Sequence, residues 1–135
     1  MTDNTDRIDY KDVVQAAERI NNVVLPLTLA TVDPGTFGDA GVVLALEFMQ
    51  HTGSFKARGA ANFTAAHIED GTMPDVGVVI ASGGNAGLAC AWAAQQHGVP
   101  ATVFLPTNAP AVKVNRLTAY GATVRLTGTE YQHAA

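Results

Sequence analysis

Two short, unbroken apolar runs with a helix-length segment between them constrain the fold of this chain more than any other feature. The runs cover residues 76–81 and 101–105, and residues 86–97 between them have the length and composition of a helix. Strands that lack alternating polar residues are typical of parallel sheets buried on both faces. A parallel pair also needs a crossover connection, which this helix would supply. The pattern therefore predicts an α/β chain with a mostly parallel sheet and helical crossovers.

The alternation of strands and helices extends in both directions from this pair. The further elements that we expect are a helix over 9–20 capped by Asp9, extended backbone over 23–27, a loop over 33–41, a strand over 42–48, a helix over about 55–67 and a strand over 123–126. Pro110 suits the first turn of another helix, and Gly121 suits the left-handed stop at its end.

The C-terminal end of the sequence does not match a finished domain. Residues 128–135 have the pattern of a strand exit followed by the first turn of another helix. We therefore expect residues 1–135 to be the N-terminal portion of a longer domain.

Charge and composition narrow the possible partners. The chain has 8 basic and 12 acidic residues, a net charge of −4, and no basic run that could neutralise phosphates along a nucleic acid. The first twenty residues lack the apolar centre of a secretory signal, and no apolar run is long enough for a bilayer. We expect a cytoplasmic protein that binds neither nucleic acid nor membrane. Cys90 has no second cysteine or neighbouring ligand, so we expect a buried structural thiol and no metal site.

The first segment that carries chemistry is residues 50–60, with the sequence QHTGSFKARGA, at an expected junction between a buried strand and a helix. Lys56 would lie near the helix start. There, the positive end of the helix dipole and partial desolvation both favour a neutral, nucleophilic amine. For an arbitrary lysine, a solvated surface charge is the more common explanation.

The second segment is residues 81–88, with the sequence ASGGNAGL, again between an expected strand and a helix. Glycines allow several backbone N–H groups to converge on an anion ahead of the helix. A dinucleotide-binding loop is excluded because Asn85 occupies the second glycine of a G-x-G-x-x-G pattern begun at Gly83, and because no acidic residue follows the next strand. Taken alone, the loop could equally be a turn that only closes the connection.

These two segments resemble one known family. The run from Thr52 to Ala60 matches the signature T-G-S-F-K-x-R-G-A, and the second loop matches S-x-G-N-x-G at Ser82, Gly84, Asn85 and Gly87. Lys113-Val114 and the stretch YGATV at 120–124 are a third similarity. On these residues the chain resembles the pyridoxal-phosphate enzymes of the tryptophan-synthase-β fold (fold type II), and within them the threonine/serine dehydratases and serine racemases.

The resemblance implies roles for individual residues. Lys56 would be the catalytic lysine that forms a Schiff base with pyridoxal 5'-phosphate, Phe55 would lie against the cofactor ring, and Asn85 would bond its phenolic oxygen. Ser82, Gly83, Gly84 and Asn85, with neighbouring N–H groups, would hold the substrate carboxylate. For Arg58 we expect a structural pair with a carboxylate, since arginine is suited to fixed ion pairs.

Some residues depart from the pattern or receive no role. Many relatives carry a lysine at the position of Ala45 and a histidine at that of Ala86, so carboxylate binding would depend more on the backbone. The family's phosphate-binding loop and the residue that faces the pyridine nitrogen would follow position 135. The residues to which we assign no chemical role are Glu47, Gln50, His51, Trp92 and Arg116.

The implied reaction is β-elimination of water from L-threonine or L-serine, which gives a 2-oxo acid and ammonia. Ala57 stands where the similar threonine synthases and cysteine synthases carry aspartate, which favours elimination over β-replacement. Racemases place a second serine where this chain has Gly83. We expect a homo-oligomeric lyase at full length and negligible activity in the 135-residue chain. A β-replacement enzyme and a non-catalytic binding piece remain as alternatives.

Overall fold

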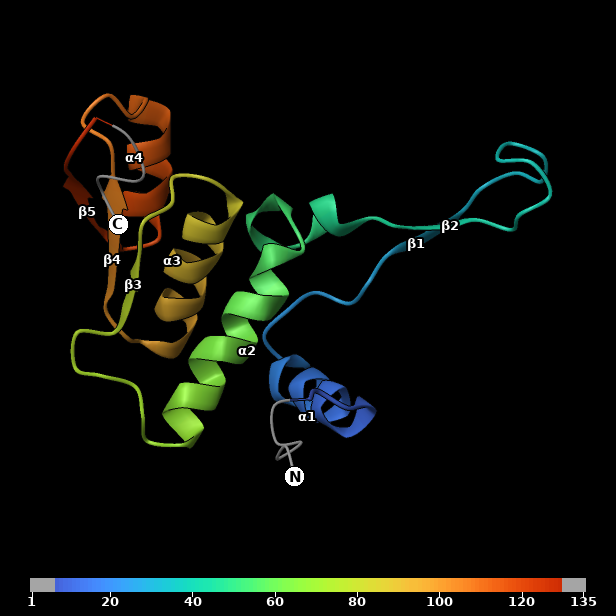
Figure 1. The fold of residues 1–135 in the computed structure, drawn as a ribbon, viewed down its shortest axis with the longest axis horizontal. Coiled ribbons are helices and arrows are strands. Elements are labelled where there is room, and N and C mark those ends of the chain that lie inside the picture. Colours follow the sequence, from blue (N-terminus) through green and yellow to red (C-terminus); the bar gives the residue numbers. More distant parts are fainter. Residues whose placement is uncertain (1–6, 130–135) are drawn as a thin grey trace.

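The computed structural model describes residues 7–129, which form helices packed on a small parallel sheet and a separate hairpin (Figure 1). The sheet has the order β3-β4-β5, with β3 at Val78–Ile80, β4 at Ala101–Leu105 and β5 at Thr123–Leu126. Both strand pairs are parallel. Helices α3, Asn85–His97, and α4, Ala111–Ala119, connect them. The predicted α/β architecture with helical crossovers is confirmed.

The core of this region lies between the sheet and helices α3 and α4. Alternate residues of β4 are buried, and they pack against apolar residues of both helices. The buried members of this cluster are Val78, Leu88, Ala91, Ala94, Ala101, Val103, Leu105, Leu117 and Ala122. The opposite face is more open, since Val79 is 55% exposed. The expectation of strands buried on both faces is therefore wrong for the described residues, because helices cover only one face here.

Strands β1, Leu29–Thr31, and β2, Val43–Ala45, pair as an antiparallel hairpin that extends away from the helices (Figure 1). The sequence pattern predicts one strand over 42–48 within the parallel series, and this prediction is wrong. The strand instead ends at Ala45, and two 3₁₀ turns follow, η1 at Glu47–Met49 and η2 at His51–Gly53. The reason is that Glu47 and Gln50 form polar contacts that hold this stretch in turns.

Helices α1, Tyr10–Ile20, and α2, Lys56–Glu69, precede the sheet. Asp9 caps α1 as predicted, in a capping box with Asp12. Arg19 of α1 then bonds Glu69 of α2 at 2.7 Å.

The predicted left-handed stop after α4 is confirmed at Gly121, where φ is +78°. The helical turn expected within 128–135 falls largely on residues 130–135, outside the described range. None of the helices within 7–129 has the length and apolarity needed to cross a membrane.

Candidate functional site

The two chemistry-bearing segments lie at the same end of two packed helices. Helix α2 begins at Lys56 and helix α3 begins at Asn85. The helices lie side by side, and Figure 1 shows both N-terminal ends pointing the same way. Ala57 and Ala61 of α2 share a buried cluster with residues of α3, and these small side chains allow a close approach. The positive ends of two helix dipoles therefore meet beside Lys56 and the glycine-rich loop, which favours an anion there.

Lys56 is the first residue of α2, and its side chain is exposed. Its Nζ lies 4.9 Å from the centre of the Phe55 ring. The position at a helix start agrees with the prediction. The expected desolvation of Lys56 does not agree with the structure, because its side chain is exposed. The expected buried strand before Lys56 is also wrong, because the exposed strand β2 and two 3₁₀ turns precede this residue.

The turn that presents Lys56 is strained. Thr52 has a φ of 67°, a left-handed conformation that is rare for a β-branched residue. Gly53 follows with a φ of 80°, which glycine adopts without such a cost. Ser54 is buried, and neither its Oγ nor Thr52 Oγ1 has a hydrogen-bond partner among the described residues. Strain and orphaned hydroxyls at one turn are typical of functional sites.

The glycine-rich loop is held in a compact form ahead of α3. Ser82 Oγ accepts a hydrogen bond from Gly84 N at 3.3 Å, and Gly84 is the N-cap of the helix. Gly83 is buried, whereas the side chain of Asn85 is exposed at the helix start. A Cβ at Gly87 would lie 1.7 Å from Ser82 O, so this position has no room for a side chain. The fourth signature residue thus lets the first turn of α3 pack directly on the loop.

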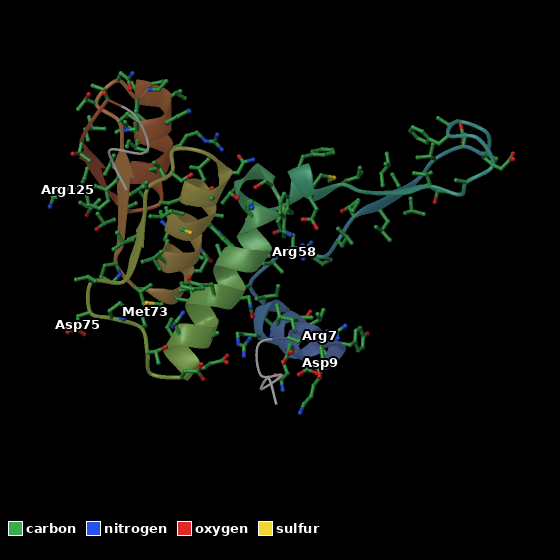
Figure 2. The ribbon with its side chains drawn as sticks, in the orientation of Figure 1. Arg7, Asp9, Arg58, Met73, Asp75 and Arg125 are labelled. Atoms are coloured by element: carbon green, nitrogen blue, oxygen red, sulfur yellow. The ribbon has the colours of Figure 1, made fainter. Side chains whose placement is uncertain are left out.

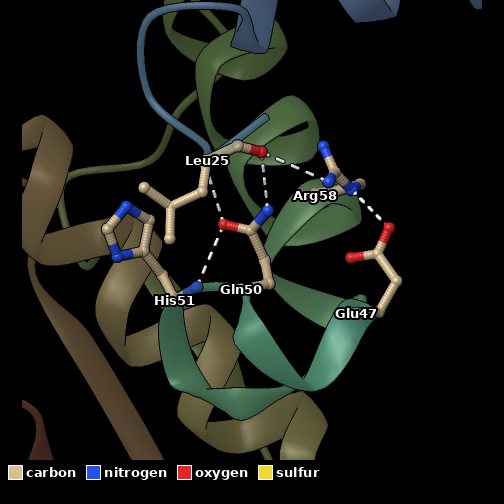
Figure 3. Close-up of polar contacts among 5 residues, drawn as sticks. All are labelled: Leu25, Glu47, Gln50, His51 and Arg58. Atoms are coloured by element: carbon tan, nitrogen blue, oxygen red, sulfur yellow. Dashed lines mark hydrogen bonds and ion pairs between the residues drawn. The ribbon is translucent and has the colours of Figure 1, made fainter. Parts of the chain in front are cut away.

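A polar cluster beneath the Lys56 turn contains two residues to which the sequence assigned no role. Arg58 lies near the start of α2 (Figure 2). Its Nε donates to Glu47 Oε1 at 2.8 Å, which confirms the expected ion pair of Arg58 (Figure 3). The side chain of Gln50 bonds both backbone groups of Leu25, and Arg58 also reaches Leu25 O (Figure 3). The available signal was the pair of polar residues three apart, just before the first signature. Nothing in the sequence indicates that these side chains bond the backbone of Leu25.

His51 and Trp92 link this turn to α3 by packing. Their rings stack with centroids 4.9 Å apart and an interplanar angle of 24°. Trp92 is only 4% exposed, so it is a core residue, as expected. Arg116 lies on α4 and is not part of the Lys56 turn. Helix α4 contacts α3 and β5. Within residues 7–129, no three His, Cys, Asp or Glu side chains gather as a metal ion would require.

Cys90 lies half-buried on α3 against the core, and burial raises the pKa of its thiol. We therefore expect iodoacetamide to modify Cys90 more slowly in the folded chain than in the urea-unfolded chain. Because the folded state favours the protonated thiol of Cys90, this thiol contributes to the stability of the folded state. The contribution is complete below the pKa of the unfolded state and is lost as pH rises through the raised pKa of the folded state. Equal alkylation rates in both states would contradict this expectation.

Comparisons with known proteins agree with these observations. The profile of the family described as "Pyridoxal-phosphate dependent enzyme" matches residues 25–135. An L-threo-3-hydroxyaspartate ammonia-lyase of Pseudomonas sp is 43% identical over 118 residues, which cover 85% of this chain and 36% of the relative. An L-threonine ammonia-lyase of Thermotoga maritima is 38% identical over 130 residues, or 94% of this chain and 31% of the relative. The chain thus spans about a third of the length of these curated relatives.

Solved structures give the same result for the fold. The crystal structure of serine racemase from Dictyostelium discoideum superposes with a TM-score of 0.82 at 32% sequence identity, covering 92% of this chain and 40% of the racemase. A superposition of this quality over nearly the whole chain shows that the fold is shared. The chain therefore belongs to the pyridoxal-phosphate dependent enzymes of fold type II, a family whose cofactor is pyridoxal phosphate.

Proposed function

We propose that this chain supplies the lysine side of the active site of a threonine/serine ammonia-lyase, which eliminates water from L-threonine or L-serine. One observation carries the proposal: Lys56 and the loop at 82–85 lie at the same end of the packed helices α2 and α3. A nucleophilic amine and an anion-binding loop are thereby brought to one place. A reaction at the Cα of an amino acid needs both.

The residues at this place fit part of pyridoxal phosphate. Lys56 offers an exposed primary amine for the aldehyde, and the exposed ring of Phe55 beside it offers an apolar surface for the pyridine ring. Asn85 offers an exposed amide at the start of α3, which suits the phenolic oxygen. The bound cofactor supplies an electron sink for the charge left when a bond to Cα breaks.

The substrate carboxylate would bind at the glycine-rich loop. The backbone N–H groups around Gly83 and Gly84, the Ser82 hydroxyl and the amide of Asn85 are donors for such a group, and the dipole of α3 favours its charge. Ala86 stands where many members of the family that the sequence resembles carry histidine, so carboxylate binding would depend more on the backbone here. This binding orients Cα toward Lys56.

The proton steps are assigned to Lys56. Its amine would remove the Cα proton and pass it on to the departing β-hydroxyl, which leaves as water. Hydrolysis of the resulting enamine consumes one water and releases ammonia, so the net products are a 2-oxo acid and ammonia. The two ammonia-lyase relatives support elimination over β-replacement, and Ala57 in place of aspartate points the same way.

The test uses a joined enzyme, in which this chain replaces the matched region of the Thermotoga maritima L-threonine ammonia-lyase. We expect this enzyme to form 2-oxobutanoate from L-threonine or pyruvate from L-serine, whereas the 135-residue chain alone gives negligible turnover. The control is the unmodified Thermotoga enzyme. A folded joined enzyme that loads pyridoxal phosphate but forms neither product would contradict the proposal.

The presence of glycine at position 83 leads to a separate prediction, namely that elimination proceeds without racemisation. Racemisation needs a proton donor on the face opposite Lys56, because one base returns the proton to the side from which it came. Racemases have a serine at this position, and buried Gly83 has no side chain to donate a proton. Chiral chromatography of residual L-serine at partial conversion should show no appreciable D-serine.

The variant Gly83→Ser provides the matching gain-of-function test in the joined enzyme. We expect it to introduce some D-serine, since it restores a hydroxyl at the racemase position. D-serine formed by the unmodified joined enzyme at a rate comparable to pyruvate would show that another group serves the second face.

A further inference from the structure

The turn before Lys56 is tied to a distant part of the chain by a cluster of three side chains, which we call the Gln50 cluster: Glu47, Gln50 and Arg58, with the backbone of Leu25 (Figure 3). We propose that the three are positioning residues, which hold the turn so that Lys56 is presented for attachment of the cofactor. This inference rests on the proposed role of Lys56. None of the three touches the reacting atoms in this assignment, so their effect is exerted through the backbone.

Gln50 is the centre of the cluster. It is 6% exposed, and its Oε1 accepts from Leu25 N at 2.9 Å and from His51 N at 3.0 Å. Its Nε2 donates to Leu25 O at 2.9 Å. The amide thus pairs with both backbone groups of Leu25, as a neighbouring strand would, and also caps η2. Three bonds to one buried amide fix its orientation, since a flipped amide would lose all of them.

Arg58 connects the start of α2 to the same point. It lies two positions after Lys56, and its guanidinium donates to Glu47 at 2.8 Å and to Leu25 O at 3.2 Å. Leu25 O therefore accepts from both Gln50 and Arg58. A planar guanidinium donates to two acceptors in fixed directions, so it couples η1, α2 and the segment at Leu25.

The strained part of the turn lies between members of the Gln50 cluster in the sequence. Thr52, with its left-handed backbone, lies between Gln50 and Lys56. Such a conformation persists only where surrounding contacts hold it. Among the described residues no carboxylate is within ion-pair distance of Lys56, and the ring that its Nζ faces belongs to Phe55, its neighbour in the same turn. The placement of Lys56 therefore depends on the backbone of this turn. Weakening the cluster should let Thr52 relax and should move Lys56.

The test measures attachment and not turnover, with pyridoxal phosphate as the probe. The 135-residue chain is incubated with the cofactor, reduced with borohydride and mapped by mass spectrometry. The quantity of interest is the ratio of adduct on Lys56 to adduct on Lys113, an exposed lysine on α4. The variants are Gln50→Glu, which replaces the donor to Leu25 O by an acceptor, and Arg58→Met, which keeps the apolar stem but removes both contacts.

The matched control is Arg19→Met. Arg19 also makes two contacts to α2, with Glu69 and Asn62 at 2.7 Å each, and its side chain is 23% exposed against 27% for Arg58. Its partners lie away from Lys56, at the middle and at the C-terminal end of α2. We expect the Lys56-to-Lys113 ratio to fall about fivefold in both cluster variants, the factor that one ordinary hydrogen bond represents, and to stay unchanged in the control.

Each outcome has one meaning. Circular dichroism first establishes which variants are folded; if Gln50→Glu is not, Arg58→Met decides. A folded cluster variant with the wild-type ratio overturns the positioning inference, and so does an equal fall in Arg19→Met, because a general loss of stability would then explain it. A wild-type chain without preference for Lys56 also overturns the positioning inference, whereas the proposed function is tested separately by the joined enzyme.

Discussion

Replacing Lys56 by alanine is expected to lower turnover of L-threonine by the joined enzyme at least about a thousandfold. In the proposed assignment, Lys56 both anchors the cofactor and removes the Cα proton, and the loss of a general base alone commonly costs about two to four orders of magnitude. The fold should be retained, because the side chain is exposed and makes no ion pair within residues 7–129. The measurement is kcat for 2-oxobutanoate formation, with circular dichroism as a check on folding.

Lys113→Ala is the matched control for this prediction. Lys113 is an exposed lysine near the start of α4, and its sequence neighbourhood also resembles the family. We expect the variant to keep turnover close to that of the parent enzyme. If Lys56→Ala retained more than about a tenth of the parental kcat, general-base catalysis by Lys56 would be rejected, because the loss of a general base commonly costs about a hundredfold or more.

Gly87→Ala is expected to lower the free energy of unfolding of the chain by about 2–4 kcal/mol, the upper range for overpacking. The added Cβ would lie 1.7 Å from Ser82 O, and that atom is backbone, so a flexible side chain cannot simply move aside. The loop and the first turn of α3 would have to separate. Urea unfolding gives the energy, and faster amide exchange at Gly84 would place the change in the loop.

Gly59→Ala separates this effect from the general effect of a methyl group in a helix. Gly59 lies inside α2, is exposed, and a Cβ added there would meet nothing within 4 Å. The variant should gain about 0.5–1 kcal/mol from helix propensity. A Gly87→Ala chain within about 0.5 kcal/mol of the parent, the range of neutral surface changes, would show that the loop and α3 do not pack closely in solution.

The parts of the fold that local pattern determines could be predicted from the sequence. The bounds of β4 at Ala101–Leu105 and β5 at Thr123–Leu126 agree with the predicted runs, and α3 begins one residue earlier than expected. The two signatures lie at helix N-termini, as predicted for Lys56 and Asn85. In these cases the apolar runs and the glycines favour the same structure.

The rest depends on pairing between distant segments, which local pattern does not encode. The apolar run that ends near Phe48 has the composition of a buried strand, yet β2 pairs with β1 as an exposed hairpin. The role of Gln50 could not be predicted, because its partner is the backbone of Leu25. A backbone group leaves no trace in residue identity, so such contacts appear only in three dimensions.

The most decisive test of Lys56 as the residue that holds the cofactor is to locate the covalent adduct. The unmodified joined enzyme is loaded with pyridoxal phosphate, reduced with borohydride, digested and mapped by mass spectrometry. We expect the pyridoxyl group on the peptide that contains Lys56. An adduct found on Lys11 or Lys113, with Lys56 unmodified, would show that the assignment of Lys56 is wrong.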